Sequence, residues 1–356
     1  MKKIKSRPYY AGLILIMGVF FCSLPAYAEN SFWGRSIASH RRGPGDYNFV
    51  LAYDGLARIY KVHVPAGYDR NNPLPVVIAL HGGGGNAAGS IGFFKLNEKA
   101  DKENFIVVYP EGTGKRVMGK VFGSWNAGGC CPPACVNKVD DVGFISKVID
   151  TLEKDFKVDA KRIHAVGFSN GALMCYRLAC ELSDKIASIA VGGGQDSLNG
   201  CQPKSSVAIL HFHGTKDKCA PYDGGTCGGC FADYLNNLGI PADRSASLWQ
   251  CRPVPEYINE WRVMDGCSAS AKVVYQKGSA TCISYSQCKD NTEVVLCTLE
   301  GSGHTWPGGN YGNKICDSRP DSPACREWKK EIGEINRDLS ANDMLWEFFK
   351  NHPKKE

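Results

Sequence analysis

Short apolar runs alternate with amphipathic segments along most of the chain. The apolar runs are rich in β-branched residues and have the length of buried strands, and most of them end in glycines or polar turns. Strands alternating with helices predict a mostly parallel sheet covered by helices on both faces, an α/β fold. The predicted strands span 47–53, 58–64, 73–80, 105–112, 162–166, 186–194, 205–217, 272–276, 281–286 and 293–301, and the predicted helices span 139–156, 171–182, 256–267 and 340–352.

Residues 218–254 interrupt this rhythm. The segment is rich in turn residues and contains four cysteines. We interpret it as a disulfide-stapled loop insertion rather than a further sheet element. No internal repeat and no linker to a second module is visible, so residues 29–356 are expected to form a single domain that carries this cysteine-rich insertion.

The first 28 residues have the pattern of a secretory signal peptide. A basic start with Lys2, Lys3, Lys5 and Arg7 precedes an apolar run over 11–21, and Ala26-Tyr27-Ala28 forms an A-x-A cleavage site. The alternative, a membrane anchor, is disfavoured because the run is shorter than the ~20 residues that a spanning helix needs. We therefore expect cleavage near Ala28 and secretion, either periplasmic or extracellular.

Removal of the leader changes the charge of the chain. The leader holds four basic and no acidic residues, so the formal charge of +6 falls to +2. A near-neutral chain gives no electrostatic reason to expect nucleic acid or an anionic membrane surface as a partner. The oligomeric state is left open.

The cysteine content agrees with export. Of the 17 cysteines, Cys22 leaves with the leader and 16 remain. An even, dense set in an exported chain indicates disulfides, although their pairing cannot be deduced. The alternative is a zinc site at Cys227 and Cys230 or around Cys130, Cys131 and Cys135, but paired C-x-x-C units and histidines at ligand spacing are missing. No metal or other cofactor is therefore expected.

The sequence Gly167-Phe168-Ser169-Asn170-Gly171 matches the G-x-S-x-G nucleophile elbow. In such an elbow the serine sits on a sharp strand-to-helix turn, and the glycines leave room for that turn to close. A predicted strand precedes Ser169 and a predicted helix follows it, as the motif requires. An ordinary turn that uses its glycines for packing is the alternative. The motif indicates a nucleophile only if the chain also supplies a base and an acid.

A base and an acid follow downstream, each directly after a predicted strand. His304 lies in a glycine-rich loop after the strand at 293–301, and Asp217 ends the strand at 205–217. The order serine, acid, histidine is that of α/β-hydrolases. Asp196 and Asp223 are the alternatives for the acid, and an ordinary turn aspartate is the other interpretation of Asp217.

An oxyanion hole needs backbone donors close to the nucleophile. The N–H of Asn170, the residue after the serine, is one candidate, and the loop at 82–85 offers another. Glycines suit this loop because they let the backbone come close to the developing oxyanion, and our first choice for the donor is Gly83 rather than Gly82.

Several of these motifs resemble a known family. The segments "WNAGGCC", "VDDVGFI", "VGFSNGALM", "HGTKD" and "GSGHTWPGG" are similar to those of the secreted esterase family of polyhydroxybutyrate depolymerases and feruloyl or acetylxylan esterases. The resemblance covers roughly residues 45–351. It implies an α/β-hydrolase fold and a serine esterase mechanism without a metal, carried by Ser169, Asp217 and His304. The insertion at 218–254 has no counterpart in the family, which puts the substrate in doubt.

The function predicted from the sequence is a secreted serine carboxylic ester hydrolase that works through an acyl-enzyme. Trp125 and Trp306 lie beside motif loops and are candidate substrate-binding residues for an aromatic acyl group or a sugar, with core packing as the alternative. Feruloyl or acetyl esters of plant polysaccharide, or related small esters, are favoured, and polyhydroxybutyrate is the alternative. A peptide substrate and a non-catalytic binding protein on the same scaffold are the other hypotheses.

Overall fold

The computed structural model describes residues 42–117, 119–195, 200–244 and 248–355. The predicted signal peptide and the alternative acid Asp196 lie outside these residues. Within them, no helix is both long and apolar enough to cross a membrane.

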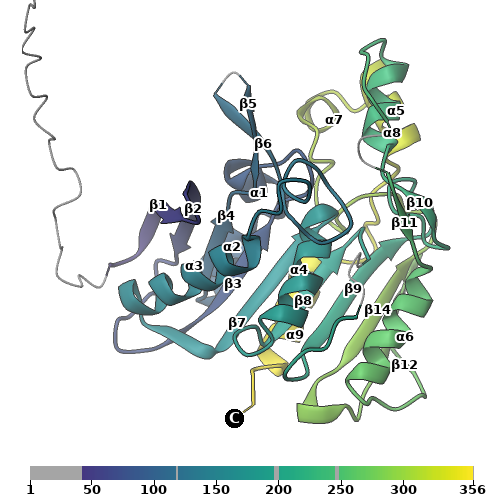
Figure 1. Ribbon diagram of the computed structural model, residues 1–356. Coiled ribbons are helices and arrows are strands. Elements are labelled where there is room, and N and C mark those ends of the chain that lie inside the picture. The colour runs from purple at the N-terminus through teal and green to yellow at the C-terminus, as the bar shows by residue number, and fades with distance from the viewer. Residues whose placement is uncertain (1–41, 118, 196–199, 245–247, 356) are drawn as a thin grey trace, which may run out of the picture. The chain divides into compact units, whose positions relative to one another are not determined.

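Among the described residues, ten strands form one sheet in the order β1-β2-β4-β3-β7-β8-β9-β14-β13-β12 (Figure 1). The six central strands, from β4 to β14, are parallel, and both edges are antiparallel. The central strands are mostly buried, except for the first residues of β7, because helices cover both faces. Their bounds are β1 (Gly45–Tyr53), β2 (Leu56–Val64), β3 (Leu74–Leu80), β4 (Ile106–Pro110), β7 (Val158–Phe168), β8 (Ser188–Gly192), β9 (Ala208–Gly214), β12 (Lys272–Lys277), β13 (Ala280–Tyr285) and β14 (Val294–Leu299).

Two sets of helices enclose this sheet. The apolar residues of α3 (Asp141–Asp155), α4 (Asn170–Glu181) and α6 (Val254–Met264) form one core with the sheet residues facing them. Those of α1 (Ala87–Phe94), α2 (Leu96–Glu103) and α9 (Ala341–Asn351) form a second core on the other face. The predicted α/β-hydrolase architecture, a mostly parallel sheet between two helical layers, is confirmed.

The described residues of the segment 218–254 contain more regular secondary structure than the sequence predicted. It contains a two-stranded ribbon, β10 (Gly225–Cys227) with β11 (Trp249–Cys251), and the helix α5 (Cys230–Asn237). Two disulfides staple it internally, Cys219–Cys230 and Cys227–Cys251. In Figure 1, α5 lies beside α8 (Pro323–Glu331). Tyr234 of α5 packs edge-on against Trp328 of α8, with 5.0 Å between ring centroids.

The structure contains further short elements that the apolar pattern did not predict. The antiparallel hairpin of β5 (Thr113–Val117) and β6 (Lys120–Ser124) follows β4, the 3₁₀ helix η2 (Lys289–Asn291) precedes β14, and α7 (Lys314–Ser318) precedes α8. These elements are short and largely exposed, so they lack the apolar periodicity that marks buried strands and helices.

Most of the cysteines are paired, as predicted, but not all. The other bridges in the described part of the chain are Cys130–Cys131, Cys180–Cys201, Cys267–Cys288, Cys282–Cys297 and Cys316–Cys325. Cys135 and Cys175 are free thiols. The predicted disulfides are therefore present, although two of the 16 cysteines remain unbridged. Cys175 lies on the buried face of α4, where it packs as a small apolar residue and where burial raises the pKa of its thiol well above the ordinary value.

Candidate active site

Ser169 occupies the turn between β7 and α4, and its backbone is strained. Its φ of 56° and ψ of −124° are backbone angles that residues other than glycine rarely adopt. The flanking glycines are required by close backbone contacts. A Cβ on Gly167 would lie 2.2 Å from the carbonyl oxygen of Gly171, and a Cβ on Gly171 would lie 2.2 Å from that of Leu80 in β3. The turn can therefore close only with glycine at both positions.

His304 and Asp217 are brought together by the loops after β14 and β9. The imidazole Nδ1 lies 2.8 Å from Asp217 Oδ2. The other carboxylate oxygen accepts hydrogen bonds of 2.8 Å from the backbone N–H groups of Cys219 and Ala220. A carboxylate that accepts three bonds is held in one orientation. With Nδ1–H donating to Asp217, the Nε2 atom of His304 is left as the basic nitrogen.

The loop that follows β3 is held by a buried histidine. The backbone N–H of Gly112 donates to His81 Nε2 at 2.9 Å, so Nδ1 carries the proton and donates to the Gly82 carbonyl at 2.7 Å. Burial lowers the pKa of His81 to about 4, which keeps the ring neutral. The N–H groups of Gly84 and Gly85 bond to the carbonyls of Gly123 and Gly82. On this loop, the N–H groups that remain as candidate oxyanion donors are therefore those of Gly82 and Gly83.

Asn170 is anchored by its side chain. Its Oδ1 accepts from the backbone N–H of Trp125 at 2.7 Å, and its Nδ2 donates to the Trp125 carbonyl at 3.1 Å. This reciprocal pair fixes the first residue of α4 against the strand end at β6. The indole N–H of Trp125 also donates to the His81 carbonyl at 2.9 Å. The two candidate oxyanion loops are therefore joined through Trp125.

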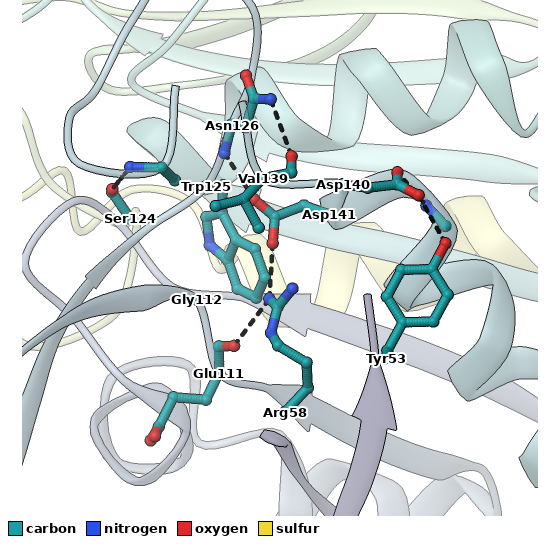
Figure 2. A network of polar contacts seen from close by, with 12 residues as sticks. Tyr53, Arg58, Glu111, Gly112, Ser124, Trp125, Asn126, Val139, Asp140 and Asp141 are labelled. Atoms are coloured by element: carbon teal, nitrogen blue, oxygen red, sulfur yellow. Dashed lines mark hydrogen bonds and ion pairs between the residues drawn. The ribbon is translucent and has the colours of Figure 1, made fainter. Parts of the chain in front are cut away.

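A buried ion pair that sequence analysis did not identify contacts Asn126, the residue after Trp125 (Figure 2). Arg58 of β2 and Asp141 at the start of α3 are 2.6 Å apart and almost fully buried. Arg58 also donates to the Glu111 carbonyl, and the second oxygen of Asp141 accepts from the N–H of Asn126 at 2.7 Å. The pair therefore ties β2, α3 and the segment after β6 together. The "VDDVGFI" motif contains Asp141, but nothing in the sequence pattern indicates that its partner is Arg58.

Ser169, His304, Gly83 and Asn170 line one cavity of about 650 Å³. Asp217 lies behind His304 with its side chain fully buried. The remaining lining is mostly apolar and aromatic, and much of it comes from the insertion and from α8. The insertion contributes Phe231, Leu235 and Trp249, α8 and its C-cap contribute Trp328 and Ile332, and Phe93 of α1 and Phe122 of β6 complete the large apolar lining.

The structure corrects the prediction that Trp125 and Trp306 line the site. Both side chains are fully buried, and neither contributes to the cavity lining. Trp125 donates to His81, and the Trp306 indole donates to Asn342 Oδ1 at 3.0 Å. Both are therefore core residues beneath the motif loops. The aromatic residues that do line the cavity include Phe231 of the insertion and Trp328 of α8, and the position of the insertion directly after Asp217 was the sequence signal for the first of them.

Asp223, the other candidate acid among the described residues, does not reach His304. Asp217 alone hydrogen bonds to the imidazole there, and Asp223 follows Tyr222 in the stapled segment. Asp217, Cys219 and His304 also have ligand atoms close enough to hold a metal ion. However, the sulfur of Cys219 is bonded to Cys230, so it is not a thiolate ligand.

Known proteins with similar sequences are esterases. A family model described as phospholipase/carboxylesterase matches residues 67–239. Feruloyl esterase B of Piromyces equi is 28% identical over 256 residues, which cover 70% of this chain and 43% of that protein. The bifunctional acetylxylan esterase/xylanase XynS20E of Neocallimastix patriciarum is 29% identical over 251 residues, which cover 70% of this chain and 31% of that protein. The chain thus spans less than half the length of each of these two relatives.

A solved structure shares the fold. The acetyl xylan esterase from Aspergillus awamori superposes with a TM-score of 0.52 and 14% sequence identity, covering 77% of this chain and 98% of that one.

Proposed function

We propose that the chain is an esterase of the α/β-hydrolase superfamily, a serine carboxylic ester hydrolase that uses Ser169, Asp217 and His304; its similarity to known esterases and its fold support this proposal. We further propose that residues 1–28 are a signal peptide and that residues 29–356 form a single exported catalytic domain with the insertion at 218–254. The density of disulfides supports an oxidising compartment.

The observation that carries the proposal is the pairing of His304 with a fully buried, three-bonded Asp217 at a cavity that also contains a serine with strained backbone angles. A strained residue is kept only where the surrounding structure enforces it, which is common at functional sites. A purely structural serine would gain nothing from this arrangement. The alternative of a non-catalytic binding protein leaves all these features without a role.

In the proposed first step, Ser169 Oγ attacks the ester carbonyl carbon while its proton moves to His304 Nε2. The negative charge that develops on the carbonyl oxygen is stabilised by the N–H groups of Gly83 and Asn170. Asp217 stabilises the imidazolium. The carbonyl re-forms, the bond to the alcohol oxygen breaks, and His304 donates its proton to that oxygen.

In the second step, water takes the place of the alcohol. His304 removes a proton from the water, whose oxygen attacks the acyl carbon bound to Ser169 Oγ. The acyl–serine bond then breaks, and the proton returns from His304 to Ser169. The products are the free acid and the original enzyme.

For the substrate, we propose feruloyl or acetyl esters of plant polysaccharide, or related small esters. The apolar, aromatic cavity wall at Phe231 and Trp328 suits an aromatic or alkyl group. The names of the relatives, a feruloyl esterase and an acetylxylan esterase/xylanase, support the same substrates. Polyhydroxybutyrate is the second candidate, because a polyester also presents ester groups on an apolar chain.

The catalytic assignment is tested with short-chain nitrophenyl esters. Ser169→Ala and His304→Ala should each lower kcat by at least ~10³, because the reaction loses its nucleophile or its base. Asp217→Asn should also be severe, since it permits the wrong imidazole tautomer, whereas Asp223→Asn serves as the matched control. Full activity in Ser169→Ala would exclude the assignment. Normal activity in Asp217→Asn, together with a loss of activity in Asp196→Asn, would assign the role of the acid to Asp196 and leave Ser169 and His304 in their roles.

The substrate is tested by comparing rates on methyl ferulate, acetylated xylan and a polyhydroxybutyrate suspension. Release of ferulate or acetate without clearing of the suspension is expected. Clearing without such release would reverse the order of the two candidates.

A further inference from the structure

A line of buried polar side chains lies behind the candidate acid. Tyr176 Oη lies 2.6 Å from His211 Nδ1, and His211 Nε2 lies 2.9 Å from His213 Nδ1. His213 Nε2 then lies 2.7 Å from the carbonyl oxygen of Ala220. The proposed reaction uses none of these three side chains, and both histidines are fully buried.

The direction of each hydrogen bond follows from its last acceptor. A carbonyl oxygen can only accept, so His213 Nε2 carries a proton and donates it to Ala220. His213 Nδ1 must then accept from His211 Nε2–H, provided the ring is neutral. Burial lowers the pKa of both imidazoles, which keeps them neutral. His211 Nδ1 therefore accepts from the hydroxyl of Tyr176.

The line joins two elements of the site. Tyr176 lies on α4, the helix that begins directly after Ser169, and both histidines lie on β9. At the other end, Ala220 is held on both sides. Its carbonyl accepts from His213, and its N–H donates to Asp217 Oδ1 at 2.8 Å.

We infer that His213 is a positioning residue, which holds the turn at 217–220 so that the Asp217 carboxylate stays aligned with His304. The inference rests on the proposed esterase function. His213 Nε2 is 3.6 Å from Asp217 Oδ2, too far for a hydrogen bond, so it acts on the acid through Ala220. Small misplacements of a catalytic group can cost up to ~10²-fold in rate. Among the described residues, His213 is the buried side-chain donor that fixes the carbonyl of Ala220 at the end of this turn.

The test compares three variants at the same position. His213→Gln places an amide N–H close to the original Nε2 atom and can still donate to Ala220. His213→Asn is too short to reach that carbonyl, and His213→Phe retains the ring shape without any donor. We expect His213→Asn and His213→Phe to lower kcat on nitrophenyl acetate by ~10–100-fold with KM within ~2-fold. His213→Gln should restore most of kcat.

A matched control is the equally buried His164. It hydrogen bonds Ser188 Oγ and stacks on Phe349, with no contact to the acid turn. His164→Asn should lower the melting temperature to a similar degree but leave kcat within ~2-fold. Proton NMR adds an independent readout, since the downfield Nδ1–H signal of His304 should be retained in His213→Gln and lost in His213→Asn.

The outcomes separate the two levels of the proposal. If the wild type lacks esterase activity, or Ser169→Ala retains it, the proposed function fails. If the wild type is active and His213→Asn has normal kcat, the positioning role is wrong. Equal losses in His213→Gln and His213→Asn also contradict it, because the effect would then not depend on the donor to Ala220. Should His213→Phe fail to fold, the comparison of the two amide variants still decides.

Discussion

The carboxyl ends of the central strands and the cavity wall formed by α5 and α8 are stabilised in different ways. The groups proposed to react lie at the ends of β3, β7, β9 and β14 and are fixed by buried hydrogen bonds such as those of Asp217 and His81. The wall formed by α5 and α8 lies outside the two large cores and has only a small apolar cluster of its own. Its Phe231 is 53% exposed. Disulfides hold this region where the large cores do not reach.

This difference indicates a division of roles. Reaction geometry needs side chains held to within fractions of an ångström, which rigid strand ends and buried polar contacts provide. Selectivity needs a surface of suitable shape, which a stapled insertion can supply and vary without disturbing the sheet. We therefore expect changes beneath the strand ends to affect all substrates alike, and changes in the wall to affect bulky esters only.

The largest effect is expected from the buried pair Arg58–Asp141, which supports the strand-end region. Asp141→Asn leaves the guanidinium buried without its counter-charge and should lower the free energy of unfolding by about 3–5 kcal/mol. Urea denaturation measures this change. The matched control is Asp150→Asn, which removes a more exposed partner of Lys185 and should cost less than ~1 kcal/mol. Similar costs for the two variants would contradict a supporting role for the buried pair.

An intermediate effect is expected from the bridge Cys219–Cys230. It links the turn after Asp217 to the start of α5, so it is the covalent connection between the two regions. Replacing both cysteines by serine should remove roughly 2–5 kcal/mol of local stability from the wall. The kcat/KM on methyl ferulate should fall further than that on nitrophenyl acetate.

The control for the bridge is the same double replacement at Cys267 and Cys288, a disulfide whose residues do not line the cavity. That variant should lose stability without a change in the ratio of the two rates. An unchanged ratio in the Cys219–Cys230 variant as well would indicate that the wall keeps its shape without the staple.

The smallest effect is expected from Phe231→Ala. Loss of one aromatic surface in the cavity should lower kcat/KM on methyl ferulate by about 10-fold, because an aromatic contact and its apolar area together contribute about 1–2 kcal/mol. The rate on nitrophenyl acetate should stay within ~2-fold. Val263→Ala is the control, since Val263 is also exposed and apolar but does not line the cavity. Equal losses on both substrates would argue against a selective role.

The same contrast explains what could be predicted from the sequence. Ser169, Asp217 and His304 each end or follow a buried strand, so strand periodicity and local motifs were sufficient to nominate them. The sheet and the helices α3, α4, α6 and α9 followed from the same periodicity, whereas α1 and α2, two short helices of the second layer, were not predicted. Trp125 and Trp306 were misplaced because a tryptophan beside a motif can pack beneath it as readily as line the cavity, and only three-dimensional contacts distinguish the two.

The wall could not be predicted for a different reason. Phe231 and Trp328 are separated by nearly a hundred positions, and they meet only because α5 of the insertion packs against α8. Neither cysteine pairing nor the partner of Asp141 leaves a periodic signal in one sequence. The two free thiols, Cys135 and Cys175, were missed because an even cysteine count does not require that every member is paired.

The central claim, that Ser169 is the nucleophile of an esterase, is tested most directly by covalent trapping. The protein is incubated with a fluorophosphonate ester, and the modified peptide is identified by mass spectrometry. The account predicts one phosphonyl group per chain on Ser169, concurrent loss of nitrophenyl ester hydrolysis, and much slower labelling in His304→Ala. Labelling at another residue, or full ester hydrolysis after complete modification of Ser169, would contradict it.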